Sequence, residues 1–120
     1  MDYDVVIIGG GPSGLSTAIK LAQTFKEKNL DKTICLLEKS AEIGGHILSG
    51  NVFETKALDE LIPDWKEKGA PLDVKVKRDA IKFLINDKYS IPVPSFAMPT
   101  MQNHGNYILS LGNLCRWLAE

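Results

Sequence analysis

VVIIGGGPSG, residues 5–14, joins a run of β-branched residues to a cluster of glycines, and this stretch decides the fold. The nearly continuous apolar run that leads into the glycines, residues 3–8 (YDVVII), is typical of a strand buried on both faces of a parallel sheet. Residues 15–28 have apolar side chains at helical spacing, with lysine and glutamate late in the segment. After a polar turn, residues 33–38 (TICLLE) are again typical of a buried strand. The pattern predicts a βαβ unit with the glycines at the turn between strand and helix.

Three glycines of this turn match the GxGxxG pattern of dinucleotide-binding proteins, in the strand–turn–helix context that the pattern requires. We expect Gly9 to permit the tight turn, Gly11 to leave room for a pyrophosphate, and Gly14 to let the helix approach the strand. Pro12 suits the first helical turn, where its missing N–H is not needed, and the Ser13 hydroxyl can donate to a phosphate oxygen. The N–H groups of a helix N-terminus favour such an anion.

Glu38 stands at the end of the second predicted strand, where a carboxylate can accept both ribose hydroxyls of an adenosine. It follows Gly14 by 24 residues, slightly beyond the usual spacing of about 20. The polar stretch KEKNLDK accounts for the difference. A carboxylate here disfavours a 2′-phosphate, so NADP is not the expected ligand. Taken alone, the glycine pattern is often just a flexible turn, and a glutamate in this position is most often just a solvated charge. Together they predict a dinucleotide site, without separating FAD from NAD.

The composition is that of an ordinary globular domain: 120 residues, 44% apolar and 24% charged. Lys plus Arg is 14 and Asp plus Glu is 15, with no basic cluster, so no nucleic-acid partner is expected. No apolar run approaches the ~20 residues of a membrane-spanning helix. Asp2 and Asp4 precede the first apolar run, unlike a secretory signal, which makes a cytoplasmic compartment the default. Cys35 and Cys115 lack CxxC spacing, and we expect each to be a small buried apolar residue.

A second glycine-rich stretch, residues 39–54 (KSAEIGGHILSGNVFE), follows Glu38 and looks like a loop. A domain that binds only a nicotinamide cofactor would usually continue into another helix and a third parallel strand. In the flavoprotein superfamily that resembles glutathione reductase and hydroxybenzoate hydroxylase, such a segment runs alongside FAD. The resemblance favours FAD, although a plain turn is the alternative for the glycine pair. It also adds further candidate cofactor-binding residues, namely Lys39, Gly44, Gly45, His46 and Ser49.

The middle of the chain predicts a short helix over residues 55–61 and a hairpin whose arms are residues 81–85 and 89–93. Trp65 is expected in the core. IPVPSFAMPTM, residues 91–101, is apolar, and its three prolines exclude a central strand. It either packs beneath the rest of a larger protein or forms an exposed ridge at a membrane surface. For the second case we single out Phe96, Met98 and Met101.

Two long stretches, residues 48–72 and 101–118, closely resemble electron transfer flavoprotein–ubiquinone oxidoreductases. The most specific segments are EIGGHILSG, PDWKEKGAPL and NHGNYI. Gly45 is a mild departure, because alanine is expected there in many relatives. The resemblance implies that the full-length protein takes electrons from reduced electron transfer flavoprotein, passes them through FAD and a [4Fe-4S] cluster, and reduces ubiquinone. It implies peripheral attachment to the cytoplasmic face of a bacterial inner membrane, or to the mitochondrial inner membrane in a eukaryote.

The resemblance also implies that the ligands of the cluster lie near the C-terminus of the full-length protein. Neither Cys35 nor Cys115 matches one, so no metal-binding residue is assigned. His46 and His104 are either near the cofactor or structural, and no catalytic residue is assigned. Another FAD oxidoreductase, such as a geranylgeranyl reductase or a monooxygenase, and a non-catalytic nucleotide-binding module stay open as alternatives.

The predicted fold class is α/β: an incomplete Rossmann-like FAD-binding domain of the glutathione reductase/hydroxybenzoate hydroxylase type, with a small β-hairpin insertion. We expect residues 1–50 to form the βαβ unit and glycine-rich loop, and residues 51–105 to form a helix, the hairpin and the proline-rich segment. Residues 106–120 are expected to start another helix. Because that helix lacks a terminator and two strands cannot cover their own faces, we expect a fragment of one domain.

Overall fold

The βαβ unit forms where the glycine pattern predicts it, in a computed structural model that describes residues 2–120. β1 (Val5–Ile8) leads through the glycine turn into α1 (Pro12–Glu27). β2 (Ile34–Leu37) then pairs with β1 in parallel, with Val5 opposite Ile34 and Ile8 opposite Leu37. The chain leaves α1 at Asn29, whose φ of 52° is a left-handed conformation that asparagine tolerates.

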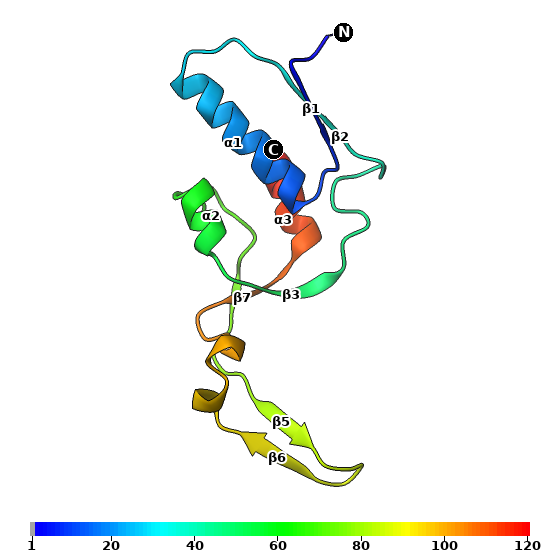
Figure 1. Ribbon diagram of the computed structural model, residues 1–120, viewed down its shortest axis with the longest axis vertical. Helices are drawn as coiled ribbons and strands as arrows, with labels where there is room; N and C mark the ends of the chain where they lie inside the picture. Colours follow the sequence, from blue (N-terminus) through cyan, green and yellow to red (C-terminus); the bar gives the residue numbers. More distant parts are fainter. Residues whose placement is uncertain (1) are drawn as a thin grey trace.

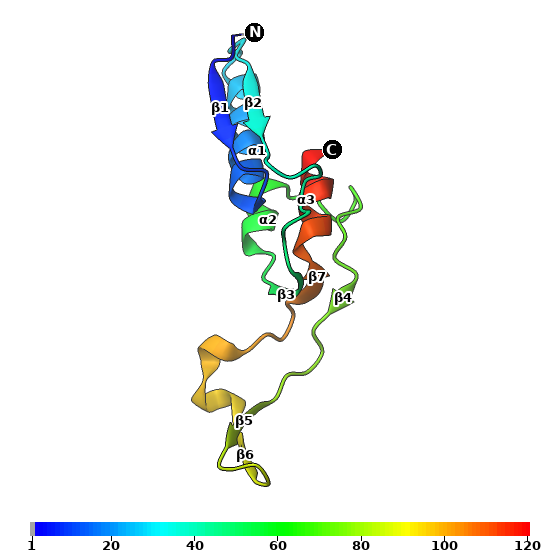
Figure 2. The same cartoon turned by 90° about the vertical axis from the view of Figure 1, so that its right-hand side faces the viewer.

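The β1–β2 pair is covered by α1 on one face only (Figure 2). Val6, Ile8 and Leu37 on the other face are 52%, 87% and 52% exposed. The expectation that these strands are buried on both faces is therefore not met in this chain. A parallel sheet needs helices on both faces, and the described residues supply one.

A second, antiparallel sheet has the strand order β3–β7–β4. β3 (Ser49–Phe53) and β4 (Val74–Lys75) both pair with β7 (Tyr107–Ser110). The prediction of a loop throughout residues 39–54 is therefore wrong for residues 49–53. Gly50, with a φ of 81°, lies at an irregularity in β3, and Gly50 and Asn51 are poor strand formers. Pairing with β7 makes this segment a strand.

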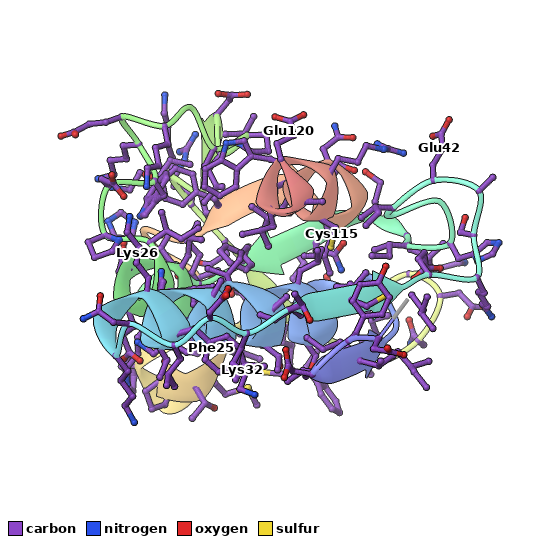
Figure 3. The ribbon with its side chains drawn as sticks, turned by 90° about the horizontal axis from the view of Figure 1, so that it is seen from above. Phe25, Lys26, Lys32, Glu42, Cys115 and Glu120 are labelled. Carbon is purple, nitrogen blue, oxygen red and sulfur yellow. The ribbon has the colours of Figure 1, made fainter. Side chains whose placement is uncertain are left out.

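The hydrophobic core lies between this sheet and two helices, α2 (Lys56–Leu61) and α3 (Leu111–Ala119). Trp65 is 3% exposed, which confirms its expected place in the core, and its ring meets the Tyr107 ring edge-on at 5.9 Å. Cys115 is fully buried, on the inner side of α3 (Figure 3). Of residues 106–120, which were expected to start a helix, Leu111–Ala119 form α3, whereas Tyr107–Ser110 form the strand β7. The buried residues of this core cluster are Leu58, Trp65, Leu72, Leu109 and Leu114.

A hairpin projects from this body and stretches the molecule to 63 × 29 × 22 Å (Figure 1). Its strands, β5 (Ile81–Leu84) and β6 (Ser90–Val93), are antiparallel and confirm the predicted hairpin. Two short 3-10 turns follow at Ser95–Ala97 and Pro99–Met101. We call residues 81–101 the hairpin arm. Pro92 sits on a strand with a single partner, where its missing N–H costs no ladder bond.

Candidate dinucleotide-binding site

In the glycine turn, the backbone of β1 and the backbone of α1 come so close together that Gly9 and Gly14 cannot carry side chains without a change of the backbone. Gly9 has a φ of 107°, and its N–H donates to the Leu37 carbonyl oxygen at 2.7 Å. At Gly14, a Cβ would collide with the carbonyl oxygen of Gly9. The expected close approach of helix and strand at Gly14 is therefore present. Both glycines hold the end of β1 against the start of α1.

The N-terminus of α1 has the properties that a phosphate group requires. Gly11 is the N-cap residue, and nothing lies within 4 Å of the place where its Cβ would be. No side chain of the described residues caps this helix, and its first turn contains no acidic residue. Pro12 opens the helix, as predicted, and Ser13 is exposed beside it. Open backbone, N–H donors and the helix dipole together suit an anion.

Glu38 lies directly across from this turn and is held by backbone donors on both of its carboxylate oxygens. Its Oε2 accepts from the Gly10 N–H at 2.6 Å, and its Oε1 accepts from the Ser40 N–H at 2.8 Å. These two bonds lower the pKa of Glu38 below its ordinary value of 4.5, and the bond from Ser40 has the larger effect. The charges of His46 and Lys39 lower this pKa further. The carboxylate is thus ionised at neutral pH. Each oxygen keeps a lone pair for a hydroxyl donor.

The second loop, residues 39–48, carries most of the other predicted site residues. Lys39, Gly45 and His46 are exposed along it, while Gly44 is half-buried. Ser49 does not belong to the loop, because it lies in β3 opposite Ser110. A Cβ at Gly45 would come 2.6 Å from the Ser40 Oγ, so alanine there requires the Ser40 side chain to rotate. The loop runs from the end of β2, beside the glycine turn.

Two partners of Glu38 were not predicted from the sequence. Gly10 falls between the first two glycines of the motif and is one of its variable positions. Ser40 follows Glu38 by two residues, a spacing at which a carboxylate often binds a backbone N–H. That spacing is the available signal for Ser40. The Gly10 contact depends on the β1–β2 pairing and has no local signal.

Other candidate groups lie elsewhere. His104 is exposed at the base of the hairpin arm. Cys35 lies in β2 and is partly buried, and Cys115 is inside the core, where burial raises the pKa of its thiol. Within residues 2–120, no three His, Cys, Asp or Glu side chains gather as a metal ion would need. Over the same residues, no helix has the length and apolar character required to cross a membrane.

Two hollows open on the side of α1 that faces α2. A groove of about 550 Å³ lies between the two helices and is lined by Lys20, Leu21 and Leu61 among others. A smaller hollow of about 280 Å³ reaches Pro12 and Ser13 at the start of α1. Apart from Ser16, its other walls are apolar and include Phe53, so it suits an apolar group and not a phosphate.

Comparison with known proteins agrees with this geometry. Residues 7–65 match the family model described as NAD(P)-binding Rossmann-like domain. The chain is 54% identical to the electron transfer flavoprotein-ubiquinone oxidoreductase of Pseudomonas aeruginosa, covering 100% of this chain and 22% of that protein. It is 56% identical to the mitochondrial protein of the same name from Dictyostelium discoideum, covering 98% of this chain and 19% of that protein.

For the mitochondrial protein of the same name from Bos taurus the identity is 51%, over 99% of this chain and 19% of that protein. The chain thus spans about a fifth of the length of the curated relatives it matches. The identity is 50–56% in bacterial and eukaryotic relatives alike, and the matches cover 98–100% of this chain. Over its whole length the chain is thus similar to the electron transfer flavoprotein-ubiquinone oxidoreductases of bacteria and eukaryotes.

Proposed function

We propose that this chain is the part of a flavin-dependent oxidoreductase that holds the ADP half of FAD. The observation that carries the proposal is the pairing of open backbone at Gly11 with the ionised Glu38 carboxylate on the other side of the turn. In this assignment Gly11, Ser13 and the N-terminus of α1 would hold the pyrophosphate, and Glu38 would accept hydrogen bonds from the ribose hydroxyls.

The choice of FAD is supported by the second loop. Lys39, Gly44, Gly45 and His46 lie on it, and it leaves β2 at Glu38 beside the glycine turn. A loop in this position gives the cofactor an extended backbone surface beyond the ribose. Glu38 carries a full negative charge there, which opposes a 2′-phosphate and so disfavours NADP.

The whole protein, in our proposal, transfers electrons from reduced electron transfer flavoprotein to ubiquinone. Bound FAD would supply the redox chemistry of this transfer. The residues of this chain would bind the ADP half of the cofactor and so orient the whole cofactor. The [4Fe-4S] cluster that the resemblance implies would need ligands from outside this chain, because such a cluster takes four cysteines and the chain has two.

We further propose that the hairpin arm attaches the protein peripherally to the bacterial or mitochondrial inner membrane. The cross-strand pairs Ile81–Val93 and Phe83–Ile91 place four apolar residues on one face of the hairpin. Phe96, Met98 and Met101 extend the apolar surface and are 82%, 39% and 54% exposed. Apolar surface of this kind suits the boundary between lipid headgroups and acyl chains.

Liposome binding of the full-length protein tests the role of the arm. Changing Phe96, Met98 and Met101 together to serine is expected to weaken the partition into liposomes. Leu30→Ser is the matched control, because Leu30 is 47% exposed at the far end of α1. Binding as tight as that of the unchanged protein would exclude these three residues from the attachment.

The visible absorption spectrum of the purified full-length protein tests the cofactor. We expect flavin bands with an added broad iron–sulfur contribution, and release of FAD on denaturation. Flavin bands alone would favour a geranylgeranyl reductase or a monooxygenase. A folded protein without a chromophore would overturn the proposal and favour a non-catalytic nucleotide-binding module. Reduction of ubiquinone by reduced electron transfer flavoprotein would then establish the partners.

A further inference from the structure

The second loop is wedged between the glycine turn and α3. On one side, the Ile43 side chain rests on Gly10, where a Cβ would lie 3.1 Å from the Ile43 Cδ1 atom. On the other side, the next residue, Gly44, faces Gly112 in the first turn of α3. Two adjacent residues of the loop therefore touch two segments that are about a hundred residues apart along the chain.

The contact between Gly44 and Gly112 is made by backbone against backbone. A Cβ at Gly44 would come 2.6 Å from the Gly112 carbonyl oxygen and 2.8 Å from the Gly112 Cα. Gly44 also has a φ of 79°, which other residues rarely adopt. A Cβ at Gly112 would come 3.0 Å from the Gly44 carbonyl oxygen, closer than a carbon normally approaches. Gly44 therefore requires glycine for this separation, and a side chain at Gly112 requires the two backbones to part by a few tenths of an ångström.

A side chain at Gly112 would displace the loop and not the helix. α3 is anchored in the core by Leu114 and Cys115, which are 2% and 0% exposed. The Trp117 Nε1 also donates to the Lys68 carbonyl oxygen at 3.1 Å. The loop, in contrast, is held mainly by its own turns, in which Gly45 N–H donates to Glu42 and Ile47 N–H donates to Gly44, both at 3.2 Å.

An ion pair between side chains also joins the loop to the same helix, but it is weak. The Arg116 Nη2 lies 3.9 Å from the Glu42 Oε2, and these side chains are 46% and 77% exposed. Figure 3 shows Glu42 pointing outward from the loop. Exposed ion pairs of this length contribute little. The distance between loop and helix is therefore set by the two glycines.

We propose that Gly112 is a positioning residue for the dinucleotide site, because it sets how closely the second loop stands to the glycine turn. This inference rests on the proposed binding of FAD beside that loop. A methyl group at position 112 pushes Gly44 away from α3 and drives Ile43 toward Gly10. In the free protein the exposed loop swings outward and relieves the crowding. Binding of FAD must bring the loop back, so the cost appears in the affinity.

The test compares FAD affinity with stability in the full-length protein. Apoprotein carrying Gly112→Val is titrated with FAD, and flavin fluorescence and the visible spectrum are followed. We expect the Kd to rise about ten-fold, with a shifted flavin spectrum and little change in the Tm of the apoprotein. Gly112→Ala is expected to have a smaller effect in the same direction. Asn113→Ala is the matched control, since its side chain is exposed on the same turn and contacts Arg116.

Each outcome decides between specific alternatives. Wild-type affinity in both Gly112 variants would overturn the inference. A lower Tm of the apoprotein, with an unchanged Kd and spectrum, would also overturn it, since Gly112 would then be only structural. If the valine variant does not fold, the alanine variant alone decides on the same readouts. Failure of the unchanged protein to bind FAD would instead overturn the proposed function.

Discussion

A 2.6 Å hydrogen bond joins the Gly10 N–H to the Glu38 carboxylate across 28 residues of sequence. The other carboxylate oxygen accepts from the Ser40 N–H at 2.8 Å, so one side chain connects the glycine turn to the second loop. The group that we assign to the ribose therefore also organises the backbone around the site. Its loss should affect the shape of the site as well as its charge.

Glu38→Gln is expected to weaken FAD binding by the full-length apoprotein about ten-fold or more. The amide nitrogen cannot accept from Gly10 or Ser40, and the charge that favours the ribose hydroxyls is removed. Titration with FAD, followed by flavin fluorescence, measures the change. Glu54→Gln is the control, because Glu54 is an exposed acid just before α2. Equal affinities in the two variants would refute the role of Glu38.

Gly11→Ala and Gly14→Ala should separate binding from folding. The space around Gly11 is open and its φ of −83° suits alanine, so we expect an almost unchanged Tm and a loss of FAD affinity. At Gly14 the methyl group meets the Gly9 carbonyl oxygen, and we expect about 1–3 kcal/mol of destabilisation. Thermal unfolding and FAD titration of both variants check this. The assignment fails if Gly11→Ala binds FAD normally.

Trp65 should be a main source of stability. Trp65→Ala leaves a cavity in the core beside Leu58 and Leu109, and we expect a loss of about 3–5 kcal/mol in the free energy of unfolding. Trp65→Phe should cost less, since it loses mainly the 2.6 Å bond from Nε1 to Asp59. That change also returns the pKa of Asp59 toward its ordinary value, because the Trp65 bond is the largest cause of its lowering.

Urea denaturation of the full-length protein measures both Trp65 variants. Trp117→Phe is the control, because the Trp117 Nε1 donates to a backbone carbonyl at 3.1 Å and its side chain is partly exposed. We expect Trp65→Ala to be the least stable of the three. A Trp65→Ala variant as stable as Trp117→Phe would contradict the core assignment.

Asp4 should make the stability of the fold depend on pH in the acidic range. It accepts from Lys32 Nζ at 2.7 Å and from the Thr33 N–H at 2.9 Å, and these bonds lower its pKa from 3.8 to about 2. A lowered pKa stabilises the fold above pH 3.8, and this contribution is lost as the pH falls toward 2. Asp4→Asn should therefore lower the Tm at pH 7 and have no effect below pH 2.

Thermal unfolding of Asp4→Asn and of the control Asp2→Asn across pH 2–7 would reveal this difference. Because the Lys32 and Asp4 side chains are 48% and 34% exposed, added salt should reduce the effect. A difference between Asp4→Asn and the unchanged protein that stayed constant down to pH 2 would contradict the mechanism.

The sequence predicts those parts of the fold that depend on local pattern. The βαβ unit, the hairpin, α2 and α3 all have strong periodic or turn signals, and the structure contains each of them. β3 and β7 were not predicted, because β3 contains Gly50 and Asn51 and β7 has only four residues before α3 begins. Each becomes a strand through pairing with a segment more than fifty residues away.

The candidate site likewise contains some features that a local sequence pattern predicts and others that depend on contacts between distant segments. Gly9, Gly11 and Gly14 follow from a motif with known spacing, and Glu38 follows from its place after β2. The contact of Gly44 with Gly112 has no signal in either segment, because two isolated glycines are compatible with many loops and helix starts. It becomes visible only when α3 and the second loop are placed side by side.

The positions of the core residues along the sequence also constrain the order in which the chain can fold during its synthesis. Leu58 and Trp65 meet Leu109 and Leu114 in one cluster, yet the entire hairpin arm is translated between them. The β1–α1–β2 unit can assemble early, because its contacts are local. The cluster stays open until α3 has left the ribosome, so the nascent chain exposes Trp65 and its neighbours throughout translation of the arm. Binding of a chaperone to nascent chains should accordingly end when residue 114 emerges.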